Sequence, residues 1–136
     1  MEAGESVDGK YVYYTKRRRN PGVWRVGVDG EGETRLLDRG IEGSWAVTAR
    51  GIVLMDKLAK PHASIEVYRF DSAAITRWLQ LPAGLVFDTA NPSFSVTPDG
   101  RWIAYVSNES GQAEVFVRSA SAAGAAQKIS TGGGTE

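Results

Sequence analysis

The chain contains no cysteine and a single histidine in its 136 residues. The absence of cysteine excludes disulfide bonds, thiolate nucleophiles and zinc sites that need cysteine ligands. One histidine cannot build a histidine-rich metal site. No apolar run approaches the roughly 18 residues of a membrane-spanning helix, and the first residues lack the basic and apolar regions of a signal peptide. We therefore expect no disulfide framework, no metal site and no membrane insertion.

An excess of charge of either sign is also missing. The 16 basic and 16 acidic residues cancel at neutral pH, and 42% of the residues are hydrophobic. These proportions are typical of a soluble globular protein. They argue against a general nucleic-acid-binding or membrane-surface protein, which would carry an overall excess of Lys and Arg.

The sequence does contain an internal repeat. Residues 6–12, SVDGKYV, match residues 95–103, SVTPDGRWI, and a less regular copy, AVTARGIV, spans residues 46–53. The glycines of the three copies are Gly9, Gly51 and Gly100, which recur at spacings of 42 and 49 residues. Spacings of about 40 to 50 residues are typical of four-stranded β-propeller blades, whereas helical repeats of about 33 or 34 residues are shorter.

The last unit has the pattern of a complete blade. A short strand ends at Val96, residues 98–100 (PDG) predict a tight turn, and residues 101–107 alternate as a second strand. Residues 113–118 predict a third strand, and a fourth is expected near residues 127–130. The segment between these last two strands is rich in alanine, which favours a helix, but its Ser and Gly favour a loop.

The whole chain, residues 1–136, is expected to be an all-β partial propeller of about three four-stranded antiparallel blades. The expected boundaries are residues 6–40, 43–82 and 92–131, with residues 132–136 as a link to a next blade. The first strand of the first blade is expected to be clipped, because little sequence precedes Asp8.

The third unit resembles a known family. Residues 96–105, VTPDGRWIAY, resemble the serine–proline–aspartate–glycine turn and apolar strand of the TolB-like, or WD-like, β-propeller repeat, with Thr97 where serine is usual. Residues 129–136 resemble the link with which such a blade ends. The resemblance is strong in the third unit, moderate in the first and weak in the second, where Ala49 and Arg50 replace proline and aspartate.

This resemblance implies that more blades complete the ring, because closed propellers typically have four to eight blades and open sheet edges need covering. We expect either an excerpt of a longer protein or a homo-oligomer that completes the propeller. Such repeats occur in TolB, in the caps of serine peptidases and in bacterial sensor proteins, so the fold alone does not choose a function. The resemblance leaves the compartment open between the bacterial periplasm and cytoplasm.

No residue pattern predicts catalysis. The histidine, His62, lies in a connection between strands, and no activated-serine motif accompanies it. Asp29, Asp71 and Asp99 lie beside turns, where such side chains bond to the backbone. The glycine run at residues 132–134 lacks the Lys and Ser or Thr that follow it in a phosphate-binding loop. We assign no catalytic, cofactor-binding or metal-binding residue and expect no enzyme activity.

All four tryptophans lie in predicted strands, where an aromatic ring can pack between blades. They are Trp24, Trp45, Trp78 and Trp102. The alternative role is that of an exposed ring that stacks on a ligand. Trp78 is the candidate for that role, because it lies on a predicted outermost strand.

One local cluster of positive charge remains. Arg17, Arg18 and Arg19 lie in the connection between the second and third strands of the first blade, and the equivalent connection of the second blade contains Lys57 and Lys60. Such connections emerge on one face of a propeller, so this face is expected to be basic and to steer a partner with anionic groups. A solvated hairpin tip is the alternative interpretation.

These observations predict a non-catalytic propeller module that binds a protein or peptide, and no nucleic acid, through the basic residues and Trp78. Two alternatives stay open. The chain could be an accessory propeller domain of a serine peptidase or another enzyme, or a truncated or engineered set of blades without a ligand.

Overall fold

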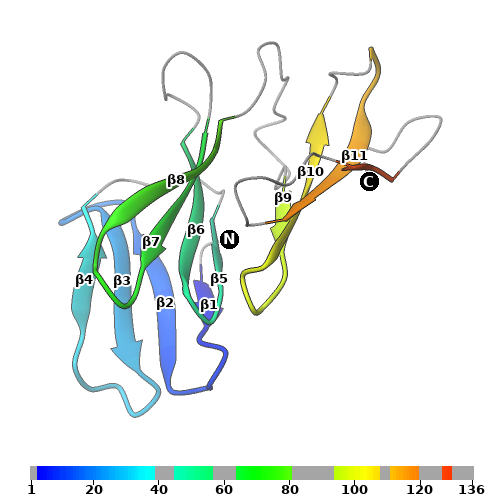
Figure 1. The fold of residues 1–136 in the computed structure, drawn as a ribbon. Helices are drawn as coiled ribbons and strands as arrows, with labels where there is room; N and C mark the ends of the chain where they lie inside the picture. Colours follow the sequence, from blue (N-terminus) through cyan, green and yellow to red (C-terminus); the bar gives the residue numbers. More distant parts are fainter. Residues whose placement is uncertain are drawn as a thin grey trace.

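The computed structural model describes residues 3–38, 45–56, 64–80, 94–107, 111–119 and 127–129. All regular structure within these residues is β, as the sequence predicts. Twelve strands form three antiparallel sheets of four strands each (Figure 1). We refer to the sheets, in chain order, as blade 1, blade 2 and blade 3.

Blade 1 consists of β1 (Ala3–Glu5), β2 (Tyr11–Lys16), β3 (Gly22–Gly27) and β4 (Thr34–Leu37). Blade 2 consists of β5 (Trp45–Val47), β6 (Gly51–Asp56), β7 (Ser64–Arg69) and β8 (Ile75–Gln80). Blade 3 consists of β9 (Phe94–Val96), β10 (Trp102–Ser107), β11 (Glu114–Ser119) and β12 (Gln127–Lys128). Each sheet is a simple meander, since its spatial order follows the chain.

The first strand of blade 1 is present, which corrects the expectation of a clipped strand. β1 pairs with β2 through Ala3 and Tyr14, Gly4 and Tyr13, and Glu5 and Val12. Its three residues equal the length of β5 and of β9. A blade of this kind needs only a three-residue inner strand, so the few residues before the first turn suffice.

A network of short hydrogen bonds closes the turn between β1 and β2. The Ser6 hydroxyl donates to Asp8 Oδ1 at 2.6 Å and accepts from the backbone N–H groups of Lys10 and Tyr11 at 3.0 and 2.9 Å. Gly9 adopts a φ of 70°, a left-handed conformation that is costly for a residue with a Cβ atom. These side chains explain why the SVDG sequence turns the chain at this point.

The turn between β9 and β10 repeats this geometry. The Thr97 hydroxyl donates to Asp99 Oδ1 at 2.6 Å and accepts from Trp102 N–H at 3.1 Å. Gly100 has the same φ of 70° as its counterpart in blade 1. Thr97 therefore replaces serine without loss of the turn, because both side chains carry the hydroxyl that the network uses.

The turn between β5 and β6 differs from the other two. Thr48 N–H donates to the carbonyl oxygen of Gly51, whereas Thr97 N–H donates to that of Trp102. The hairpin is therefore two residues shorter, and Gly51 occupies the position of Trp102. The prediction that Gly51 is the counterpart of Gly100 was wrong, because the threonines, not the glycines, mark equivalent positions.

The outermost strands of blades 1 and 2 share a β-bulge. In β8 the register with β7 shifts between Leu79 and Arg77, so Trp78 is the extra residue. In β4 the corresponding shift makes Leu36 the extra residue. Both strands have the pattern Thr-Arg-X-Leu. A bulge changes the direction of the side chain that follows it, and here it brings two consecutive side chains toward the same core.

Two hydrophobic cores hold the blades together. We call the side of a blade that faces the next blade its leading face and the other its trailing face. The first core joins the leading face of blade 1 to the trailing face of blade 2. Its buried members are Tyr13, Val23 and Leu37 from blade 1, and Trp45, Ile52, Leu54 and Tyr68 from blade 2.

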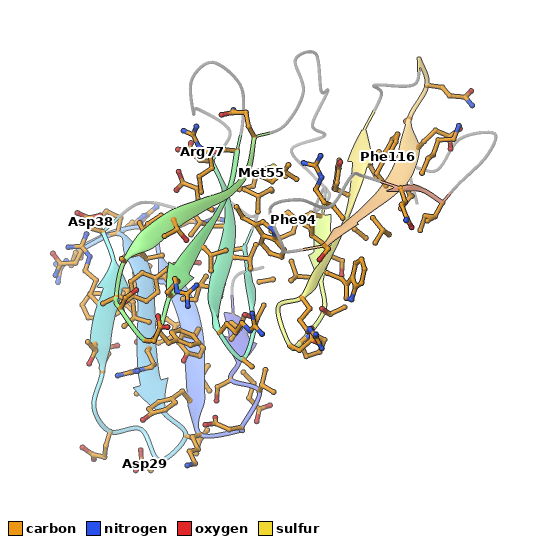
Figure 2. The ribbon with its side chains drawn as sticks, in the orientation of Figure 1. Asp29, Asp38, Met55, Arg77, Phe94 and Phe116 are labelled. Atoms are coloured by element: carbon orange, nitrogen blue, oxygen red, sulfur yellow. The ribbon has the colours of Figure 1, made fainter. Side chains whose placement is uncertain are left out.

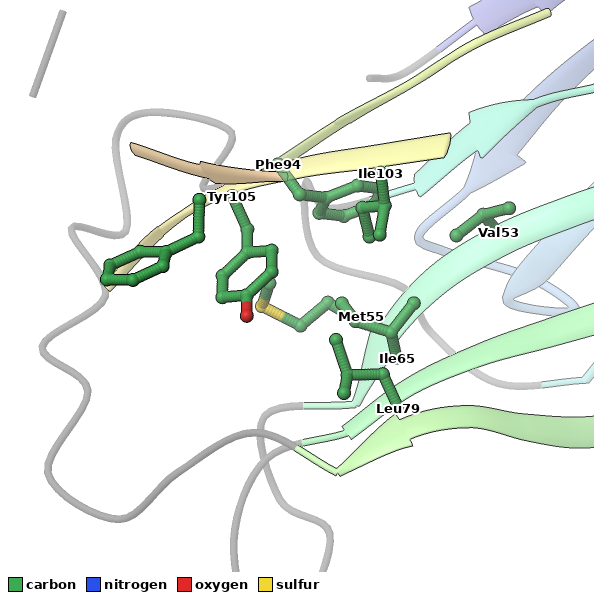
Figure 3. Packing of buried hydrophobic residues seen from close by; sticks show 8 residues of the cluster. Val53, Met55, Ile65, Leu79, Phe94, Ile103 and Tyr105 are labelled. Carbon is green, nitrogen blue, oxygen red and sulfur yellow. The ribbon is translucent and has the colours of Figure 1, made fainter. Parts of the chain in front are cut away.

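The second core joins the leading face of blade 2 to the trailing face of blade 3 (Figure 3). Its buried members are Val53, Met55, Ile65 and Leu79 from blade 2, and Phe94, Ile103, Tyr105 and Phe116 from blade 3. β6 contributes to both cores, which explains its continuous apolar sequence GIVLM. Each buried Leu, Ile or Phe stabilises the assembly by about 1.5–3 kcal/mol.

Candidate functional site

The three predicted arginines lie together in the connection between β2 and β3. Arg17, Arg18 and Arg19 are all exposed. Arg19 and Asn20 adopt positive φ angles of 40° and 60°. Asparagine is among the residues that tolerate this region, whereas arginine is not. The connection therefore turns sharply and holds three consecutive guanidinium groups at its tip.

Two side chains of blade 1 fix the base of this connection. Trp24 Nε1 donates to the carbonyl oxygen of Asn20 at 3.1 Å. Arg35 Nη2 donates to the carbonyl oxygens of Pro21 at 2.6 Å and Asp38 at 3.2 Å. These bonds tie the backbone carbonyls of Asn20 and Pro21, at the end of the connection, to two different strands.

Gly22 allows β3 to begin directly after the connection. A Cβ atom on Gly22 would lie 1.9 Å from the carbonyl oxygen of Leu37, and its φ is 143°. Only glycine allows β3 to start so close to the end of β4. Gly22 is thus required by the local packing.

A charged and aromatic cluster lies beside the connection. Lys16 Nζ is 2.9 Å from Glu33 Oε1 and 3.9 Å from the centre of the Trp24 ring. The Tyr14 hydroxyl donates to the same Glu33 oxygen. Burial of the hydroxyl, and then its bond to Glu33, raise the pKa of Tyr14 to about 12. The hydrogen bonds from Tyr14 and Lys16 lower the pKa of Glu33. The positive charge of Lys16 is therefore partly neutralised by Glu33.

The other predicted members of the basic face cannot be placed. Lys57 and Lys60, and also His62, lie outside the described residues. The described flanks are Asp56 at the end of β6 and Ser64 at the start of β7. That these lysines join the arginines on one face stays a prediction.

Trp78 is less exposed than its place on an outermost strand suggests. Its side chain is half-buried and packs against the core between blades 2 and 3. The bulge in β8 is the cause, because it turns Trp78 toward the same core as Leu79. A role of Trp78 in binding a partner stays a prediction.

Trp102 is the tryptophan that is exposed, with 49% of its surface accessible. It begins β10, directly after the turn of blade 3. Sequence reasoning missed it because all four tryptophans lie in strands, and strand position alone does not tell which face is covered.

The turns at the opposite end of the sheets carry carboxylates with structural roles. Figure 2 labels Asp29 at the tip between β3 and β4, far from Asp38 at the end of β4. Asp29 Oδ1 accepts the N–H of Glu31 at 3.0 Å, and Asp99 Oδ1 accepts that of Arg101 at 3.0 Å. Capping of the local backbone is confirmed for these two aspartates.

Asp71 also bonds to the local backbone, at Ser72, and an arginine binds it as well. Arg69 Nε and Nη2 donate to its two carboxylate oxygens at 3.1 and 2.9 Å. This pairing lowers the pKa of Asp71 to about 2. The hydrogen bond from Thr97 lowers the pKa of Asp99, and the bond from Ser6 lowers that of Asp8.

Two shallow hollows lie near these turns. One, of about 360 Å³, is lined by β4 and by the hairpin between β7 and β8, with Arg35, Asp38 and Tyr68 as its polar residues. The other, of about 540 Å³, is lined by Ala49, Arg50, Arg69, Phe70 and Asp71. The described lining of the two hollows contains no Ser, Thr, Lys or His side chain.

The described ranges contain no group of three or more His, Cys, Asp or Glu side chains that could hold a metal ion. The same part of the chain contains no helix long and apolar enough to cross a membrane.

Comparison with solved structures identifies the architecture. TolB from Acinetobacter baumannii superposes with a TM-score of 0.67 at 17% identity, over 94% of this chain and 31% of that one. A putative TolB from Agrobacterium tumefaciens gives 0.64 at 16%, over 96% and 46%. A chain of the nidogen/laminin complex gives 0.63 at 17%, over 96% and 47%.

The chain thus spans between about a third and a half of the length of these similar structures. Neither a protein-family model nor a curated protein sequence matches it. The likeness therefore lies in the fold, which agrees with the three meander sheets and with the repeated turns. The chain is a set of three blades with a TolB-like β-propeller fold.

Proposed function

We propose that this chain is a non-catalytic binding module that recognises an anionic segment of a protein or peptide through Arg17, Arg18 and Arg19. The observation that carries the proposal is the run of three exposed arginines in a connection whose end bonds to two different strands. Trp24 and Arg35 bond to its backbone carbonyls at 3.1 and 2.6 Å. A connection held in one conformation loses less entropy when it binds than a flexible one.

A protein is the partner class that the comparisons support. One similar structure comes from a complex of nidogen with laminin. Arginine also suits such a partner chemically, because its planar guanidinium can donate two parallel hydrogen bonds to a carboxylate. With a net charge of zero for the whole chain, attraction of the partner would come from this local cluster.

The experiment selects acidic peptides from a display library on the wild-type chain and measures their affinity by fluorescence polarisation. The variant R17E/R18E/R19E should weaken binding at least tenfold, and wild-type affinity should fall as salt is raised. The control variant K10E/R77E/R101E makes the same change of net charge at three exposed residues elsewhere. Equal affinities for the wild type and the first variant would contradict the proposal.

We also propose that copies of this chain associate to complete a propeller ring. Three blades leave one sheet face uncovered at each end of the described assembly, since the two cores join only blade 1 to 2 and blade 2 to 3. Sheets of this kind need their open faces covered.

A further inference from the structure

Two sheet faces, one at each end of the three-blade set, have no described blade packed on them. Their residues can be compared with the residues at equivalent positions of the other blades, which are buried. Blade 3 has an uncovered leading face, and blade 1 has an uncovered trailing face. No described strand packs on either of them. Equivalent positions follow from the pairing registers of the sheets.

Ile129 is the first residue of the leading face of blade 3 to be compared. Its N–H donates to the carbonyl oxygen of Val115 at 2.9 Å, which extends β12 by one residue. The same position is held by Leu37 opposite Val23 in blade 1 and by Leu79 opposite Ile65 in blade 2. Leu37 and Leu79 are 5% and 6% exposed, whereas Ile129 is 63% exposed. Blade 3 thus has an apolar side chain at a position that, in blades 1 and 2, is covered by the following blade.

Trp102 is a second exposed apolar residue of blade 3 whose counterpart in blade 1 is covered. Its carbonyl oxygen accepts the N–H of Thr97, as that of Tyr11 accepts the N–H of Ser6. Tyr11 packs against the core that blade 2 completes, whereas Trp102 is 49% exposed. The leading face of blade 1 therefore buries part of an aromatic ring where that of blade 3 leaves one open.

The rest of the leading face of blade 3 is also apolar. Ala104 lies opposite Val117, and Val106 lies opposite Val115. Directly opposite residues share one face of a sheet, and these four share it with Trp102. All four are partly exposed. Their neighbours Ile103, Tyr105 and Phe116 point to the other side, into the core with blade 2.

The trailing face of blade 1 is also apolar and has no described blade packed on it. Val12 lies opposite Val26, and Tyr14 lies opposite Trp24. These four side chains are partly exposed. The counterparts of Val12, Ile52 and Ile103, are 0% exposed, and those of Tyr14, Leu54 and Tyr105, are 2% and 4% exposed.

Both described cores join a leading face to a trailing face, and none joins two faces of the same kind. Leading faces supply mainly aliphatic side chains to these cores, whereas trailing faces supply most of the aromatic rings. The open leading face of blade 3 is aliphatic apart from Trp102, and the open trailing face of blade 1 contains Tyr14 and Trp24. The two open faces thus match each other in the way that the covered faces do.

From this repetition we infer that the leading face of blade 3 in one copy packs on the trailing face of blade 1 in a second copy. Two such junctions related by a two-fold axis close a ring of six blades, within the range of closed propellers. This inference rests on the proposed association of copies, and it names the surfaces that form the contact. Arg17, Arg18 and Arg19 are not among the residues named for either open face, although Trp24, which bonds to their connection, is one of them.

The test measures the solution mass of the intact chain by light scattering. The wild type should have twice the mass of the 14.7 kDa chain. The variant V106E/V115K charges the open face of blade 3, and V12E/V26K charges that of blade 1. Each pair consists of directly opposite residues, so the new charges can pair within the sheet, and the net charge does not change. Each variant alone should have the mass of one chain.

Mixing the two variants distinguishes this contact from any other. The mixture contains one intact leading face and one intact trailing face on different chains, so a complex with twice the chain mass should return. The control V7E/V28K places the same substitutions at valines that are 55% and 62% exposed in turns, and it should keep the wild-type mass. If circular dichroism shows that V106E/V115K does not fold, W102D/I129D replaces it, because both of its residues are already exposed.

Each other outcome overturns the inference. A wild-type chain with the mass of one copy would reject both the inference and the proposed association. A double mass that persists in either face variant would reject only the inferred faces, since copies would then associate elsewhere. A failure of the mixture to recover the double mass would reject the pairing of leading with trailing faces. Peptide affinity, which depends on the arginines, is measured separately.

Discussion

The backbone N–H of Ala49 donates to the carbonyl oxygen of Pro98 at 2.8 Å, which joins the first turn of blade 2 to the first turn of blade 3. The contact is close, because a Cβ atom on Gly100 would lie 3.0 Å from Thr48 Oγ1. The inner turns of these two blades are therefore bonded to each other, in addition to the hydrophobic core between the sheets.

Thr48 should be important for stability because its buried hydroxyl holds this turn together. It is 2% exposed, donates to the carbonyl oxygen of Gly51 at 2.9 Å and accepts from the N–H groups of Arg50 and Gly51. Thr48→Val keeps the shape of the side chain but removes the hydroxyl that bonds to the backbone groups of Arg50 and Gly51. We expect this change to lower the free energy of unfolding by about 2 kcal/mol. Urea unfolding measures this value.

The matched control for that experiment is Thr34→Val. The Thr34 hydroxyl also donates to a backbone carbonyl, that of Gly32, but at an exposed site. We expect a change below about 0.5 kcal/mol there. Equal effects at the two positions would show that burial of the Thr48 hydroxyl is not what matters.

Gly51 should tolerate no side chain. A Cβ atom would lie 2.0 Å from the carbonyl oxygen of Tyr68 on β7, so Gly51→Ala must push two paired strands apart. We expect a loss of about 3 kcal/mol in the free energy of unfolding. Gly30→Ala is the control, because no atom lies within 4 Å and only its positive φ of 87° opposes alanine, at about 1 kcal/mol. A larger loss at Gly30 would contradict the packing argument.

Stability should fall when the pH is lowered below about 4. Hydrogen bonds hold the pKa values of Asp8, Asp71 and Asp99 below their usual range. A carboxyl group with a lowered pKa in the folded state stabilises the fold above its unfolded pKa, and this stabilisation is lost as the pH falls through the folded pKa. For Asp71 that loss extends to about pH 2.

The measurement is the free energy of unfolding as a function of pH in the wild type and in the variant D8N/D99N. The variant should lose less stability than the wild type between about pH 4.5 and pH 2, because two of the titrating groups are gone. Asp38→Asn, which removes an exposed carboxylate outside these turns, serves as the control. Identical slopes for D8N/D99N and the wild type would contradict the role of the turn aspartates.

Tyr14 should titrate later than an ordinary tyrosine. Its pKa is about 12, raised first by burial and then by the bond from its hydroxyl to Glu33. Glu33→Gln removes the negative charge and should lower this pKa, although the contribution of burial remains. Ultraviolet absorbance during alkaline titration measures it, and the difference from Tyr14→Phe isolates the signal among the five tyrosines. An unchanged titration in the Glu33 variant would leave burial as the sole cause.

Much of the local structure follows from the sequence. Residues 102–107 form β10, within the alternating segment 101–107 that predicts a strand, and the PDG turn forms with glycine at positive φ. The short polar motifs specify these elements because the side chains that close each turn lie within five residues of one another. The TolB-like resemblance of residues 96–105 likewise predicts the correct architecture.

Other features depend on contacts between distant segments. The bulge at Trp78 arises from the pairing of β8 with β7 and turns an outer-strand aromatic side chain inward. The difference between Gly51 and Gly100 depends on which carbonyl each threonine binds, and the spacing of the glycines conceals it. The first strand of blade 1 could not be inferred from length alone, because its stability comes from pairing with β2.

The sequence by itself determined the repeat, the four-stranded units and the turns, since each depends on residues that are close along the chain. Only the tertiary structure decided which side of each strand is covered. In a strand, successive side chains alternate between two faces, and Trp45 and Trp102 look alike until the neighbouring blade is in place. Trp45 lies in a core between two blades at 3% exposure, whereas Trp102 faces the side where no described strand packs and is 49% exposed.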